Sequence, residues 1–254
     1  MRILLYSDYP ALFNALQEES KRYTGIELLQ VNPSTEILTL PDFNFLVLAP
    51  LAASHELGAT PCNASQLDAW QEKTTALVDL CALRQAQLTL LSSAGVFSHH
   101  QTSASELDTP DSVTPLAKSL LMLEKTVAQL PQAIILRTPP SLNAEIVEIG
   151  VRANLKTQIV SDPNFAANFR GTQPLSDLAR VLLGIWLQLD AGAKASGLFH
   201  YAGSGALSDA ALLEPLSLTT QHIMNVFGIH PRAWREGLPA LLESLKESTK
   251  NAAT

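Results

Sequence analysis

Side chains able to bind or react follow several short apolar runs of this sequence. Ser92 and Ser93 come directly after one run, and Arg137 and Thr138 end another. His55 lies shortly after a third run. If these runs are parallel strands, their carboxyl ends share one edge of a sheet, and open α/β folds bind ligands at that edge. We therefore predict a ligand cleft there, with these five side chains as candidates.

Two further histidines, His99 and His100, stand in the polar stretch after Ser93. A histidine pair can serve as a general base or as metal ligands. No cysteine or acidic residue stands at ligand spacing from them, so we expect a solvent-facing loop and no metal site. Catalysis by a different class of enzyme, through His55 or His99, is an alternative.

The elements that must position these side chains alternate between strand-like and helix-like runs, which indicates βαβ units. Strands are predicted at residues 2–6, 27–31, 44–49, 87–92 and 133–137. Helices are predicted at residues 11–23, 65–84, 114–130, 144–155 and 176–189. Nearly continuous apolar strands are typical of parallel sheets covered on both faces. The predicted fold class is therefore α/β, with a Rossmann-like doubly wound parallel sheet.

The segment from residue 90 to 124 resembles the active-site region of the dTDP-4-dehydrorhamnose reductase family, the sugar-nucleotide reductase branch of the extended short-chain dehydrogenases. In that family a strand ends in STDYVF and a later helix carries YGKSKLAGE. Residues 92–97 read SSAGVF here, and residues 119–124 read SLLMLE. The alignment implies that Ser93 takes the place of the substrate-binding hydroxyl, while Leu116 and Leu120 replace the catalytic Tyr and Lys. Lys118 lies about 200° around the helix from Leu120 and cannot substitute.

Other motifs of that family recur in the same order. Residues 133–138 (AIILRT) resemble its LRT strand, and residues 169–179 resemble its GxPTxxxDLA segment. Residues 197–203 (GLFHYAG) resemble its GxYHxxG strand, and residues 227–238 its closing FGI-x-P-x-W-R helix. The resemblance also makes Arg170 a candidate contact to an anionic ligand, although Glu214 replaces the arginine of the RPxxSxL segment.

The resemblance implies an NAD(P) site, yet the residues that would build it differ. The family's first strand leads into GxxGxxG, whose glycines let the backbone approach the pyrophosphate. Ser7, Pro10 and Phe13 occupy these positions, and Asp8 adds a negative charge. Only residues 32–43, interrupted by two prolines, join the second and third strands. We predict a loop or at most one helical turn there, and no bound cofactor.

Composition excludes several classes of function. Hydrophobic residues make up 46% of the 254 residues and charged residues only 16%, enough for a large core. A net charge of −7 argues against nucleic acid or an anionic membrane as partner. Without a membrane-length apolar run or a recognisable leader, a cytoplasmic location is expected. Cys62 and Cys81 lack metal or redox spacing, so both are expected to be reduced.

Three units are expected along the chain. Residues 1–140 form a degenerate Rossmann-like domain, residues 141–246 form a small interleaved substrate lobe that returns to the main fold, and residues 247–254 form a polar tail. In short-chain dehydrogenases the helices that match 65–84 and 114–130 commonly build a homodimer interface. Plain packing of these helices on the sheet is the alternative.

The missing Tyr and Lys favour a non-catalytic homologue of NAD(P)-dependent sugar-nucleotide reductases. Such a protein would act as a binding or regulatory subunit, with a small molecule or a protein as partner. An active reductase of this kind with relocated catalytic groups, and therefore with bound NAD(P), is the alternative.

Overall fold

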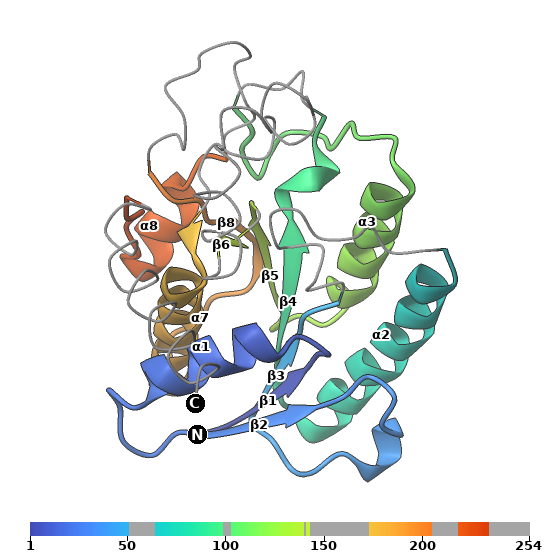
Figure 1. Ribbon diagram of the computed structural model, residues 1–254, viewed down its shortest axis with the longest axis vertical. Helices are drawn as coiled ribbons and strands as arrows, with labels where there is room; N and C mark the ends of the chain where they lie inside the picture. Colours follow the sequence, from blue (N-terminus) through green and yellow to red (C-terminus); the bar gives the residue numbers. More distant parts are fainter. Residues whose placement is uncertain (51–63, 99–102, 140, 143–172, 205–217, 234–254) are drawn as a thin grey trace, which may run out of the picture.

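The computed structural model describes residues 1–50, 64–98, 103–139, 141–142, 173–204 and 218–233 (Figure 1). The elements in chain order are β1 (Arg2–Tyr6), α1 (Pro10–Ser20), β2 (Glu27–Val31), η1 (Ile37–Thr39), β3 (Phe45–Leu48), α2 (Ala64–Arg84), β4 (Gln87–Ser93), η3 (Ala94–Val96), α3 (Pro115–Val127), β5 (Ile134–Thr138), β6 (Ser141–Leu142), β7 (Gln173–Pro174), α7 (Leu175–Asp190), β8 (Gly197–His200) and α8 (Gln221–Phe227). No helix in this part of the chain is long and apolar enough to cross a membrane.

The central element is a six-stranded parallel sheet in the order β2-β1-β3-β4-β5-β8. Helices α1 and α7 lie together on one face, and α2 and α3 lie on the other (Figure 1). The Rossmann-like parallel sheet predicted from the sequence is confirmed, and its five predicted strands agree with β1 to β5 to within a residue. The sixth strand, β8, did not appear in the apolar pattern because only its last two residues are buried.

Each face of the sheet carries its own core. Leu4, Leu46, Leu90 and their neighbours pack under α2 and α3, whereas Ile3, Val47 and their neighbours pack under α1 and α7. On the second face the fully buried Trp186 donates from Nε1 to Thr89 Oγ1 at 3.0 Å. This bond ties the middle of α7 to the middle of β4.

The short connection from β2 to β3 contains one 3₁₀ turn, η1, as the sequence predicted. The carbonyl oxygen of Pro33 accepts from Tyr6 Oη at 2.9 Å and from Lys73 Nζ at 2.6 Å. Arg84 donates to the carbonyl oxygens of Leu40 and Pro41. Hydrogen bonds to its backbone carbonyl oxygens therefore hold the connection against β1 and α2.

The later part of the chain contributes to the main fold. Helix α7, close to the predicted 176–189, packs along α1, and β8 completes one edge of the sheet. The helix predicted at 144–155 and the tail 247–254 lie outside the described residues, as does most of the predicted small lobe. The proposed boundary at residue 140 therefore stays a prediction.

The Trp186–Thr89 contact leads to a stability prediction. Thr89→Val keeps the shape of the side chain but leaves the indole N–H buried without its acceptor, which should lower the free energy of unfolding by about 1–3 kcal/mol. Urea unfolding measures the change, and Thr75→Val on the exposed side of α2 is the matched control. Equal losses in the two variants would show that the bond does not stabilise the sheet.

Candidate binding site at the carboxyl edge of the sheet

The strand order reverses between β1 and β3, and the buried Ser7 links the ends of these two strands. Ser7 Oγ donates to the carbonyl oxygen of Ala49 at 3.3 Å and accepts from the backbone N–H of Tyr9 at 3.2 Å. Tyr9 is itself buried, and Pro10 begins α1 without a side-chain cap. The position of the first family glycine is thus filled by a side chain that links the two strand ends.

The remaining residues of this turn follow the same pattern. Asp8 is exposed, and Phe13 packs against the core between α1 and α7. A phenyl ring therefore stands where the glycine pattern leaves room for close approach of the backbone.

Helix α3 presents leucines where the family has its catalytic pair. Thr114 caps the helix by accepting from the backbone N–H of Ala117 at 3.2 Å, and Pro115 occupies the first turn. Leu120 is fully buried, and Leu116 is partly buried against the same core. Lys118 is exposed, as its rotation around the helix predicted.

The two serines at the end of β4 have internal partners. Ser93 Oγ accepts from the backbone N–H of Gly95 at 3.0 Å and so caps η3. Ser92 Oγ donates to Glu124 Oε1 at 2.6 Å. Both side chains are buried, and each has a structural role in the turn or under α3.

Arg137 on β5 forms a bidentate ion pair with Glu124 on α3. Arg137 Nε donates to Oε1 at 2.9 Å, and Nη2 donates to Oε2 at 2.6 Å. The side chains are 4% and 8% exposed, and the guanidinium carbon lies 5.2 Å from the centre of the Phe97 ring. The charge of Arg137 is therefore already balanced, so this residue is not a spare cation for a diphosphate.

His200 ends β8 beside this pair. Its Nδ1 lies 3.2 Å from the carbonyl oxygen of Ala104, its backbone N–H donates to Glu106 Oε1 at 2.8 Å, and its ring meets Phe97 edge to face at 5.8 Å. Burial, and next the charge of Arg137, lower the pKa of His200 to about 4. The imidazole is neutral at pH 7; because a carbonyl only accepts, Nδ1 carries the proton and Nε2 presents a lone pair.

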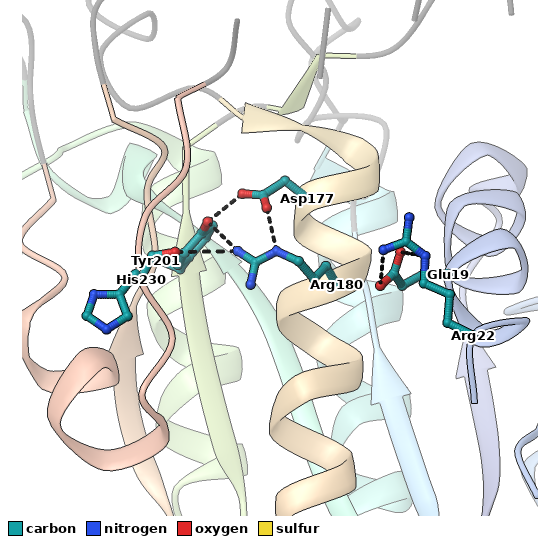
Figure 2. A network of polar contacts seen from close by, with 6 residues as sticks. All are labelled: Glu19, Arg22, Asp177, Arg180, Tyr201 and His230. Atoms are coloured by element: carbon teal, nitrogen blue, oxygen red, sulfur yellow. Dashed lines mark hydrogen bonds and ion pairs between the residues drawn. The ribbon is translucent and has the colours of Figure 1, made fainter. Parts of the chain in front are cut away.

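A second polar network holds α7 to the chain after β8 (Figure 2). Tyr201 Oη donates to Asp177 Oδ2, and Arg180 donates from Nε to Asp177 Oδ1 at 2.7 Å. Arg180 Nη2 also reaches Tyr201 Oη at 3.2 Å and the carbonyl oxygen of His230 at 3.5 Å. Burial and the neighbouring carboxylate raise the pKa of Tyr201, so its phenol stays protonated.

Several residues predicted from the sequence lie outside the described part of the chain: His55, His99, His100, Arg170 and Cys62. Among the described residues, strand pairing places Ser92 beside Arg137 on one face of the sheet. Ser93 lies beside Thr138 on the other face. The described residues include no cluster of side chains suited to a metal ion. Cys81 is a buried free thiol whose pKa burial raises to about 12.

Sequence reasoning missed two polar residues at this edge: Glu124 and His200. Glu124 stood in the aligned SKLAGE segment and His200 in the GxYHxxG strand, but neither motif shows a side-chain partner. The register of β5 against β8, which pairs Arg137 with His200, is the missing information.

The depressed pKa of His200 predicts how stability depends on pH. The unfolded histidine has a pKa near 6.5, so between pH 6.5 and about 4 the unfolded state binds the extra proton. Stability should therefore fall as pH drops through this window, by up to about 1.4 kcal/mol per pH unit from this group. Urea unfolding at pH 7 and pH 5 should show a smaller difference for His200→Phe than for the exposed control His222→Phe. An equal pH dependence in both variants would exclude His200 as the cause.

No family model matches the chain, and no curated protein matches it. Solved structures nevertheless resemble it over nearly its whole length. A dTDP-4-dehydrorhamnose reductase from Clostridium acetobutylicum has a TM-score of 0.68 at 17% identity, covering 97% of this chain and 100% of that chain. The dTDP-4-dehydrorhamnose reductase from Bacillus anthracis in complex with NADP gives 0.66 at 13% identity, covering 96% and 98%.

A short-chain dehydrogenase/reductase superfamily protein from Agrobacterium tumefaciens with bound NAD gives a TM-score of 0.65 at 15% identity, covering 100% of this chain and 98% of that chain. At such identities these likenesses concern the fold. The chain has the Rossmann-like fold of dTDP-4-dehydrorhamnose reductases and other short-chain dehydrogenase/reductase structures.

Proposed function

We propose that the protein is a non-catalytic relative of the NAD(P)-dependent sugar-nucleotide reductases and acts as a binding or regulatory subunit. The observation that carries the proposal is the complete burial of Leu120, the residue aligned with the catalytic lysine. A lysine ammonium at this position would have to be buried in the core under α3, where an unpaired charge is strongly disfavoured.

The turn after β1 supports the absence of a nucleotide cofactor. A pyrophosphate needs backbone N–H groups at a helix N-terminus and room for close approach. Here Ser7 bonds across to Ala49, Tyr9 is buried beside it, and Pro10 lacks a backbone donor. The carbonyl oxygen of Pro33 accepts hydrogen bonds from Tyr6 and Lys73. These bonds hold the β2–β3 connection in the region where the family would bind the adenosine end of the cofactor.

Two described hydroxyl groups that could serve as a substitute proton donor, those of Tyr201 and Ser93, are engaged elsewhere. Reduction of a carbonyl requires a proton for the developing alkoxide, and general acid catalysis contributes roughly 10²–10⁴-fold. Tyr201 is buried, and its hydroxyl donates to Asp177 on the α7 face, across the sheet from α3. Ser93 is committed to Gly95. These placements support a binding role over a relocated active site.

The exposed sides of α2 and α3 are the surfaces on which we propose a homodimer. Leu83 on α2 is 82% exposed and Met122 on α3 is 55% exposed, although both helices also pack on the sheet. Gln71 Nε2 donates to Thr126 Oγ1 at 2.9 Å and links the two helices side by side.

The first test is cofactor binding. NADPH titrated into the protein by calorimetry should show a dissociation constant weaker than about 100 μM, which also means little thermal stabilisation at ordinary concentrations. An active sugar-nucleotide reductase of the same fold is the positive control. Tighter binding would overturn the non-catalytic proposal and favour the reductase alternative.

The second test restores the family pattern. Leu116→Tyr with Leu120→Lys removes buried apolar surface worth about 1.5–3 kcal/mol for Leu120 and less for the partly buried Leu116, and it introduces a charge into the core. The double variant should therefore be less stable in urea and should not reduce a dTDP-4-keto sugar. Met122→Lys, on the exposed side of the same helix, should leave stability nearly unchanged. A stable and active double variant would contradict the proposal.

A further inference from the structure

The end of α1, the first turn of α7 and the chain after β8 meet around a small cavity of about 120 Å³. Its polar lining consists of three arginines, two carboxylates and one hydroxyl: Arg22, Arg180, Arg232, Glu19, Asp177 and Ser176. Figure 2 shows the Glu19–Arg22 pair beside α7, which carries Asp177 and Arg180. The cavity is well below the roughly 300–1,000 Å³ of pockets for drug-sized ligands, so it fits a small ion or one end group of a larger molecule.

Both carboxylates of this cavity already have a cationic partner. Glu19 is buried and pairs with Arg22 at 3.4 Å. Asp177 is buried as well, and its two oxygens accept from Arg180 Nε and from Tyr201 Oη. Each carboxylate is therefore balanced by one arginine.

Arg232 brings a third positive charge to the cavity. Its carbonyl oxygen accepts from the backbone N–H of Ser204 at 2.9 Å, and the next residue, Ala233, forms a bridge with Ser204, so the backbone is held at this place. No residue in the described part of the chain forms a hydrogen bond or an ion pair with the Arg232 guanidinium. One positive charge is thus left without a partner, in a chain whose net charge is −7.

The first turn of α7 adds backbone donors to the same cavity. Pro174 stands at the N-cap position and offers no side-chain acceptor to the N–H groups that follow. The exposed Ser176 lies in this turn and lines the cavity with its hydroxyl-bearing side chain. The N-terminus of a helix carries a partial positive charge, and its unpaired N–H groups bind anions. The unpaired arginine and the helix N-terminus therefore favour the same kind of ligand.

A tetrahedral oxyanion fits these donors better than a carboxylate. A guanidinium binds two oxygens of a phosphate or a carboxylate at once. A carboxylate bound in this way by Arg232 has both of its oxygens engaged. A phosphate keeps two further oxygens, which can accept from Ser176 and from the first-turn N–H groups of α7.

We propose that this cavity binds a phosphate group, either as the free ion or at the end of a small molecule. Arg232 and the first turn of α7 hold its oxygens, and Arg22 and Arg180 keep the surrounding potential positive. In the resembled family the pyrophosphate would lie before the other end of α1, where Ser7 now fills the turn, so the two sites are separate. The proposal goes beyond the proposed function and does not depend on it.

Calorimetry with inorganic phosphate at constant ionic strength tests the proposal. Heats of binding are measured in place of melting temperatures, because phosphate and sulfate stabilise many proteins by exclusion from their surface. Phosphate should bind with a Kd of about 1 mM or tighter, sulfate should compete with it, and acetate should not. Absence of binding up to about 20 mM, or a preference for acetate, would overturn the proposal.

Two organic phosphates identify the source of the phosphate group: methyl phosphate and glycerol 3-phosphate. Binding about tenfold tighter than that of inorganic phosphate would assign the site to the end group of a small molecule. Equal or weaker binding would assign it to the free ion.

Arg232→Gln removes the unpaired charge from an exposed position and should weaken phosphate about tenfold, because a charge-assisted hydrogen bond is lost. Ser176→Ala, also at an exposed position, should weaken it about threefold. Lys118→Gln is the matched control, since it removes one positive charge from the exposed side of α3 on the opposite face of the sheet and should leave the affinity unchanged. Unchanged affinity in Arg232→Gln, or an equal loss in Lys118→Gln, would overturn the proposal.

Discussion

The carboxylate of Glu124 is the group on which the arrangement of the carboxyl edge depends. It accepts from Ser92 on β4 and twice from Arg137 on β5, and it projects from α3. Strands β4 and β5 and helix α3 are therefore joined at one buried carboxylate. An isolated buried carboxylate or guanidinium is costly, so neither partner can change alone without strong destabilisation. Because two of its nitrogens are engaged, the guanidinium of Arg137 is held in one orientation.

The two ends of the carboxyl edge of the sheet differ in what occupies them. At the point where the strand order reverses, Ser7 and Tyr9 fill the space between β1 and β3 with protein atoms. At the end of β5, by contrast, one buried ion pair and the Ser92 hydroxyl join β4, β5 and α3.

The sequence was sufficient for the sheet but not for the polar contacts within it. The strands β1, β3, β4 and β5 were found because each is buried on both faces and is nearly continuous in apolar residues. The edge strand β2 is only partly buried, and its three apolar residues were enough to find it. The strand β8 was recognised only through a motif, since two of its four residues are not buried. Arg137 was interpreted as a residue of an open cleft, because nothing in a linear sequence shows that Glu124 faces it from another element. The different burial of Leu116 and Leu120 likewise depends on the rotation of α3, which packing determines.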